Sequence, residues 1–217
     1  MVSGLIVLDG PVSVILFILV FAPLFILGFY FGRNTPKLLL FGGMGWVLAL
    51  ILRIIPLNLF QLLVQDLVAV IGYSAILAGL FEEGMRFWLI KRTKTSDLKA
   101  GLTFGLGWGI AEALVIYFPS VLLSPTTSSL GLLDLLPGVL ERYVAVLAHI
   151  ALTFIVLKAT SYKEYLVVAV VAHTVLDWVA GLAYYVMRLP VWQVEGLVAA
   201  YTLFLAFYAI YTIKKIY

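Results

Sequence analysis

Residues 59–90 decide the fold, and they read LFQLLVQDLVAVIGYSAILAGLFEEGMRFWLI. This apolar run is longer than the roughly 20 residues with which a helix crosses about 30 Å of hydrocarbon. Polar residues interrupt its first part, namely Gln61, Gln65 and Asp66. We therefore expect a strong tilt, a break near Gly72 or Gly79, or a first part that lies outside the hydrocarbon.

The composition of the 217-residue chain excludes a water-soluble globule. Hydrophobic residues make up 64% and charged residues 12%, whereas soluble domains contain about 25% charged residues. One core of this size could not cover so much apolar surface, so a lipid bilayer must cover it. The formal net charge of +3 is too small to indicate a nucleic-acid partner. The absence of cysteine excludes disulfides and thiol nucleophiles.

Six further apolar runs are bounded by charge, proline or glycine. With the first run, they give about seven spans, at residues 12–31, 37–55, 59–90, 98–118, 137–157, 165–187 and 192–213. The sequence predicts an all-α bundle of transmembrane helices in the cell membrane. Residues 1–217 form a single integral membrane domain, whose polar core is expected within residues 76–180.

Basic residues predict the orientation, because short loops rich in Lys and Arg stay on the cytoplasmic side. With seven spans, one side receives Arg33, Lys37, Lys91, Arg92, Lys94, Lys99, Lys158, Lys163, Lys214 and Lys215. Arg53, Arg142 and Arg188 fall near the other side. We expect the N-terminus outside, the C-terminus in the cytoplasm, and residues 119–137 as the main external loop.

Seven of the ionisable residues lie deep within the predicted spans, where each charge costs about 2.5 to 3.5 kcal/mol at the helix centre. They are Glu82, Glu83, Arg86, Glu112, His149, His173 and Asp177. A helix rises about 1.5 Å per residue, which places these groups from four helices at neighbouring depths. They must face one another or water, so we expect them around one hydrated cavity that opens toward the cytoplasmic half.

Spacing of four residues places side chains on one helix face. Three pairs have this spacing: Glu82 with Arg86, Trp108 with Glu112, and His173 with Asp177. Arg86 would stabilise a charged carboxylate, and Asp177 would orient or charge His173. Two adjacent glutamates resist simultaneous ionisation, which favours a carboxylate that takes a proton from water as a general base. Structural ion pairs and helix clamps are the alternative explanations.

Residues 81–86, FEEGMR, resemble the EExxxR motif of the membrane protease superfamily that includes type II CAAX prenyl endopeptidases and bacteriocin-processing enzymes, although two residues instead of three separate the glutamate pair from the arginine. Trp108 to Glu112 and His173 to Asp177 resemble the FxxxE and HxxxD motifs of its PrsW branch, with tryptophan in place of phenylalanine. Residues 141–149 and the glycine-rich helix before them are more similar to the YhfC-like intramembrane proteases. The layout is also similar to the anterior-pharynx-defective subunit of gamma-secretase, a related scaffold.

The resemblance implies an intramembrane endopeptidase that hydrolyses membrane-anchored proteins or peptides. In this family mechanism Glu82, with or without Glu83, activates water, and His173 holds that water or stabilises the oxyanion. No cofactor is expected, but zinc remains an alternative, with His149, His173 and Glu112 as candidate ligands. A non-catalytic scaffold and a proton-coupled transporter are the rival functions. We interpret Trp108 as a packing residue, and Arg142 with Glu141 as an interfacial ion pair.

Overall fold

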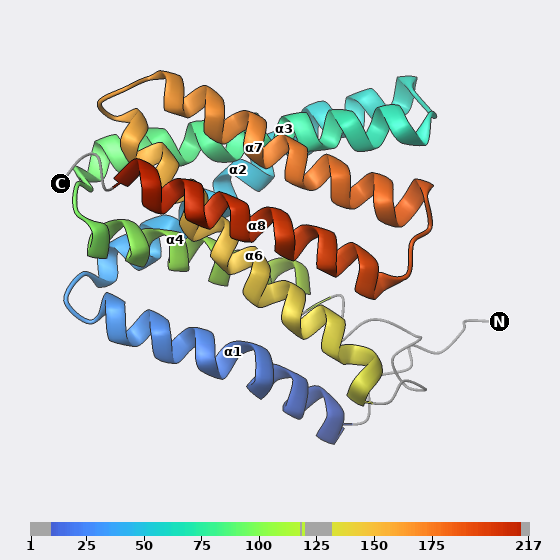
Figure 1. Ribbon diagram of the computed structural model, residues 1–217, viewed down its shortest axis with the longest axis horizontal. Helices are drawn as coiled ribbons and strands as arrows, with labels where there is room; N and C mark the ends of the chain where they lie inside the picture. The colour runs from blue at the N-terminus through green and yellow to red at the C-terminus, as the bar shows by residue number, and fades with distance from the viewer. Residues whose placement is uncertain (1–9, 118, 120–131, 214–217) are drawn as a thin grey trace.

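The computed structural model describes residues 10–117, 119 and 132–213, and in this part every regular element is a helix (Figure 1). The order is α1 (Gly10–Gly32), α2 (Pro36–Leu63), α3 (Leu67–Thr93), α4 (Leu98–Glu112) with the π-helical η1 (Ala113–Tyr117), α6 (Leu132–Ala159), α7 (Glu164–Gly181) with the π-helical η3 (Leu182–Val186), and α8 (Val191–Ile213). The predicted all-α bundle is confirmed.

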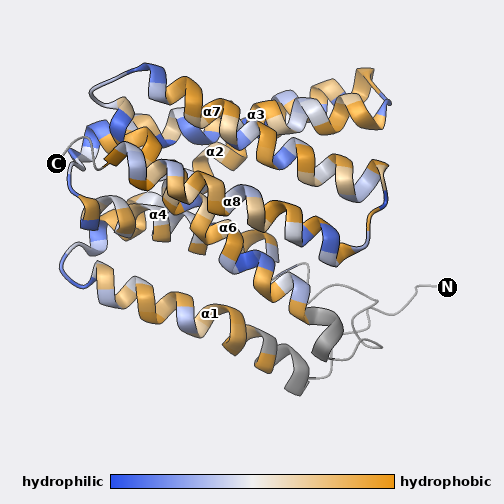
Figure 2. Cartoon of the chain, in the orientation of Figure 1, coloured by the Kyte–Doolittle hydropathy of each residue, from blue (hydrophilic) through white to orange (hydrophobic). Residues whose placement is uncertain are grey.

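Six helices in the described part are long and apolar enough to cross a membrane. They are Pro36–Leu63, Leu67–Thr93, Leu98–Tyr117, Leu136–Ala159, Glu164–Val186 and Val191–Ile213. In the seventh helix, α1, the segment Phe17–Gly32 is apolar but shorter. Hydrophobic residues run along all of these helices, while hydrophilic ones gather in the turns and at a few interior positions (Figure 2). The protein is therefore a multi-pass membrane protein.

The chain divides the long apolar run of residues 59–90 at residues 64–66. Helix α2 continues through Pro56 to Leu63, which a membrane helix tolerates because neighbouring groups satisfy the freed backbone. Asp66 then caps α3, since its carboxylate accepts a hydrogen bond of 2.7 Å from the backbone N–H of Ala69. The first part of the run belongs to α2, and α3 has an ordinary membrane-spanning length.

The predicted break near Gly72 or Gly79 is wrong, because both glycines lie inside α3. Gly79 instead permits close helix packing. A Cβ atom there would lie 2.6 Å from the carbonyl oxygen of Val170 in α7. The glycine therefore lets α3 and α7 approach backbone to backbone, as small residues commonly do in membrane bundles.

Helix α4 lies at the centre of the bundle and packs between α2 and α6, while α3 packs on α7 and α6 on α8. Gly107 makes the α2–α4 contact possible, since a Cβ atom at this position would overlap the carbonyl oxygen of Leu39. The central core consists of buried side chains from six helices, α2 to α8, including Trp46, Leu89, Phe104, Ile155 and Leu205.

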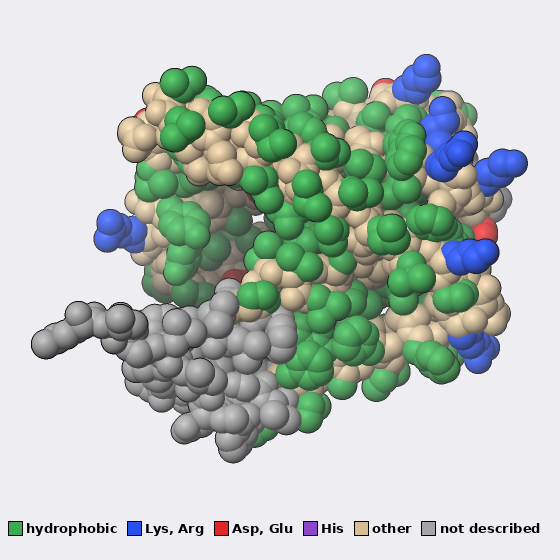
Figure 3. Space-filling view, turned by 180° about the vertical axis from the view of Figure 1, so that it is seen from behind, with side chains coloured by type: hydrophobic (Ala, Val, Ile, Leu, Met, Phe, Trp, Pro, Cys, Tyr) green, Lys and Arg blue, Asp and Glu red, His purple; other side chains and the backbone are tan. Residues whose placement is uncertain are grey.

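The α1–α2, α3–α4 and α6–α7 turns lie at one end of the bundle, where most Lys and Arg side chains gather (Figure 3). The grouping of these turns matches the sequence-based topology, and the side of the membrane that they face stays a prediction. Lys214, Lys215 and most of the expected external loop lie outside the described residues. Arg53 and Arg142, which we expected near the other side, both line a cavity of the bundle.

Gly107→Val tests the α2–α4 contact. We expect a loss of about 1 to 3 kcal/mol, because the added side chain must push two backbones apart. The melting temperature of the purified protein, followed by tryptophan fluorescence, should fall by several degrees. Gly196→Val is the matched control, since nothing lies within 4 Å of a Cβ atom at that glycine. Equal melting temperatures for the two variants would contradict the close helix approach.

Candidate active site

The site is built on a completely buried ion pair within α3. Glu83 and Arg86 are both 0% exposed, and Arg86 is the third residue after Glu83, so the two share a helix face. Arg86 Nη1 donates to Glu83 Oε1 at 2.7 Å and to Oε2 at 2.6 Å. A buried charge without a partner costs several kcal/mol, so each of these groups requires the other.

This ion pair orients two histidines from other helices. His173 Nδ1 in α7 lies 2.7 Å from Glu83 Oε1, and His149 Nδ1 in α6 lies 3.0 Å from Arg86 Nη2. A carboxylate held by a guanidinium accepts hydrogen bonds, so His173 Nδ1 must be the donor. A guanidinium only donates, so His149 Nδ1 must be the acceptor. In their neutral forms the two rings are therefore opposite tautomers: His173 exposes a bare Nε2, while His149 carries its hydrogen on Nε2.

Glu112 receives the hydrogen of His149. The distance from His149 Nε2 to Glu112 Oε2 is 2.5 Å, and Arg142 Nη1 donates to Glu112 Oε1 at 3.1 Å. Arg142 also bonds to Glu141 and is only 7% exposed. The interpretation of Arg142 as an interfacial pair with Glu141 is thus incomplete, because the same guanidinium joins α6 to the carboxylate of α4.

Glu82 lines the cavity and is held by two donors. Trp108 Nε1 donates to Glu82 Oε2 at 3.2 Å, and Arg53 Nη1 lies 3.0 Å from Oε1. The Arg86 guanidinium stacks over the Trp108 ring, 4.4 Å from its centroid. Trp108 is therefore more than the packing residue that we inferred from the sequence, since it links the buried ion pair to Glu82.

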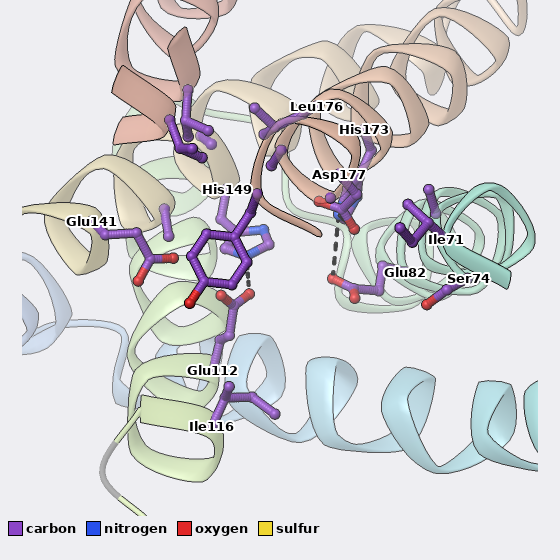
Figure 4. A pocket seen from close by; sticks show the side chains of 18 of the residues that line it. Ile71, Ser74, Glu82, Glu112, Ile116, Glu141, His149, His173, Leu176 and Asp177 are labelled. Atoms are coloured by element: carbon purple, nitrogen blue, oxygen red, sulfur yellow. Dashed lines mark hydrogen bonds and ion pairs between the residues drawn. The ribbon is translucent and has the colours of Figure 1, made fainter. Parts of the chain in front are cut away.

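These side chains meet at a cavity of about 1040 Å³. Figure 4 shows Glu112 of α4 and His149 of α6 pointing at each other, with Glu82 of α3 facing His173 and Asp177 of α7. His173 Nε2 lies 4.0 Å from Glu82 Oε2 and 3.7 Å from Asp177 Oδ2. The expected convergence of acids and imidazoles around one cavity is present.

The seven residues predicted for the site form two groups. Five line the cavity, namely Glu82, Glu112, His149, His173 and Asp177. Glu83 and Arg86 lie behind them and hold the histidines. From the sequence we expected Asp177 to orient the ring of His173. In the structure Glu83 orients this ring, because it accepts the hydrogen bond from His173 Nδ1.

Four further charged residues line the cavity without having been predicted for the site, namely Arg53, Glu141, Arg142 and Glu195. All four are ionisable residues in apolar runs, the same signal that identified the seven. Because these residues lie near the ends of the predicted spans, the sequence suggested a position at the membrane interface instead. The direction of the opening also differs from the prediction, because the lining continues toward Gln61, Leu67 and Tyr185, away from the basic turns.

The donor set fits a divalent metal ion. One ligand atom each from Glu82, Glu112 and His149 can lie within 4.8 Å of one another, and carboxylate oxygen with imidazole nitrogen suits zinc. Glu82 thus joins the candidate ligands, and His173 Nε2 faces the same cavity. The Glu83 bond to His173 Nδ1 resembles the carboxylate that commonly orients a metal-binding histidine. Metal binding at His149 Nε2 would displace the hydrogen shared with Glu112 and so release a proton.

Fold and site together define a multi-pass helical membrane protein with a buried cluster of acids and histidines. The family model for YhfC intramembrane metalloprotease matches residues 44–123. The resemblance predicted from the sequence is thereby confirmed over most of α2, all of α3 and α4, and η1, a range that contains Glu82, Glu83, Arg86 and Glu112. Neither the comparison with curated proteins nor the one with solved structures found a match.

Arg86→Gln tests the dependence on the buried ion pair. We expect a loss of about 3 to 5 kcal/mol, because Glu83 would keep a buried charge without its partner. The added change Glu83→Gln should recover part of the loss, since it removes that charge. Thermal unfolding of the two single variants and the double variant measures this coupling. Purely additive effects would show that the two residues do not act as a pair.

Proposed function

We propose that the protein is an intramembrane endopeptidase that hydrolyses membrane-associated proteins or peptides with water activated by Glu82. The observation that carries this proposal is the convergence of Glu82, Glu112, His149 and His173 at one cavity within the bundle. The match to an intramembrane metalloprotease family supports the same class of reaction.

Glu82 is the proposed general base. Its carboxylate faces the cavity and is fixed by Arg53 and Trp108, which limits the positions from which it can take a proton from water. His173 Nε2 carries no hydrogen in the neutral ring and lies 4.0 Å from Glu82. It can accept a hydrogen bond from the same water and so help to position its oxygen for attack.

The positively charged residues of the cavity are suited to stabilise the intermediate that forms when water attacks the peptide bond. Attack of water on a peptide carbonyl forms an oxyanion, which fixed hydrogen-bond donors stabilise. Arg53 and Arg142 line the cavity. We propose that these groups stabilise the oxyanion, and that the proton taken up by Glu82 passes to the amine that leaves when the C–N bond breaks. Asp177 lies beside His173 and would stabilise that ring if it becomes charged.

We further propose that Glu112 and His149 hold a divalent metal ion beside Glu82, with zinc as the best candidate. When bound, such an ion polarises a carbonyl group and makes water a stronger acid. Arg86 and Glu83 would keep the two imidazoles in place around it, whether or not the ion is present.

Glu82→Gln tests the general base. We expect cleavage of tagged single-span substrates by the purified protein to fall by at least about 100-fold, because the amide cannot accept a proton. The melting temperature should stay within a few degrees of the wild type. Glu164→Gln is the matched control, since Glu164 begins α7 at the end with the basic turns. A folded wild type that cleaves no substrate would instead favour a scaffold.

Zinc content tests the ligand set independently of cleavage. We expect elemental analysis of the purified wild type to show about one zinc ion per chain, and Glu112→Gln to lower this content strongly. Zinc added to the chelated protein in weak buffer should release a proton, because the ion displaces the hydrogen on His149. Glu164→Gln should behave as the wild type. Equal zinc content in Glu112→Gln and wild type would contradict the proposed ligand set.

A further inference from the structure

The cavity extends from the site toward only one end of the bundle. Beyond the acids and histidines, its lining includes Gln61 near the end of α2, Leu67 at the start of α3, Tyr185 in η3 and Val194 near the start of α8. Gln61, Leu67 and Tyr185 are exposed at the surface. All four positions lie at the end opposite the α3–α4 and α6–α7 turns. In Figure 3 the surface is hollowed away from the edge where the basic side chains gather.

Packed apolar side chains close the other end. On α3, α4 and α6, buried residues of the central core lie between the site and the basic turns. Leu89 and Ile90 follow Glu83 in α3, Phe104 precedes Trp108 in α4, and Ile155 follows His149 in α6. None of these four apolar residues lines the cavity. A peptide from the basic end would have to displace this close-packed layer, which costs several kcal/mol.

Both π-helical segments lie at the open end. Segment η1 follows Glu112 directly, and η3 begins five residues after Asp177. They contribute Ile116, Tyr117, Tyr184 and Tyr185 to the cavity lining. Single turns of π-helix often occur at functional sites, because they change the direction of side chains within a helix. Here they place aromatic rings along the route from the surface to the site.

We propose that the substrate reaches the site from the membrane face opposite the basic turns, as an extended peptide segment that passes η1 and η3. This inference rests on the proposed function and specifies its substrate: a membrane-anchored protein whose scissile segment is exposed on that face. With basic turns in the cytoplasm, as charge placement predicts, that face is the extracytoplasmic one. Extended backbone fits the route because its free N–H and C=O groups can meet the polar lining.

The absence of cysteine from the natural sequence allows a direct test without further mutation. Ser74→Cys and Ala180→Cys place a thiol in the cavity lining. Gln65→Cys and Ser161→Cys are reference positions, at the exposed α2–α3 turn and at the exposed α6–α7 turn. A membrane-impermeant maleimide is added to intact cells and, separately, to inverted membrane vesicles, and the labelled fraction of each full-length variant is measured.

We expect Ser74→Cys and Ala180→Cys to be labelled in the same preparation as Gln65→Cys, and Ser161→Cys to be labelled in the other. Labelling of the cavity positions from the side of Ser161→Cys would overturn the proposal, and so would labelling from neither side. The result does not depend on catalysis. An inactive protein with the expected labelling would refute the protease function alone, while an active protein with reversed labelling would refute the entry route alone.

Discussion

The ion pair between Glu83 and Arg86 is the constraint on which the site depends. Both groups are completely removed from water, so their charges must be neutralised within the bundle. Arg86 donates to both carboxylate oxygens of Glu83, and each residue has one further hydrogen bond, which goes to a histidine of α6 or α7. Packing of these helices against α3 therefore completes the buried pair, and the same contacts set the positions of the imidazoles.

The two histidines differ in chemistry because their hydrogen-bond partners, Glu83 and Arg86, carry opposite charges. A histidine beside a carboxylate presents a bare nitrogen to the cavity, whereas one beside a guanidinium presents a hydrogen. His173 and His149 lie close together, with ring centroids 5.8 Å apart, yet one can accept a proton and the other can donate a hydrogen bond. One buried ion pair thus supplies both an acceptor and a donor at the same cavity.

The sequence predicted the helices well because hydrocarbon thickness limits the length of an apolar run. It placed the turn between α2 and α3 incorrectly, because Pro56 breaks a soluble helix more readily than a membrane one. The sequence identified the polar residues at the site, because charged groups are costly in lipid. The depth of these residues along their helices did not show which end of the bundle is closed by packed apolar side chains. That depended on tertiary packing of residues such as Leu89 and Ile155. The role of Trp108 was missed for the same reason, since a tryptophan in an apolar helix packs equally well without its hydrogen bond.

Exposure of the acidic side chains increases from the buried pair to the mouth of the cavity. The side chains of Glu83 and Glu82 are 0% and 3% exposed, and those of Glu112 and Asp177 are 20% and 40% exposed. Glu82 therefore lies deeper in the cavity than Glu112 and Asp177. Charges interact more strongly where water is scarce, so Arg53 acts on Glu82 with little screening. A peptide that fills the outer cavity would exclude further water and strengthen these interactions at the proposed place of cleavage. The buried end of the cavity is thus the best place for the proposed general base. The exposed end is the best place for the binding of substrate.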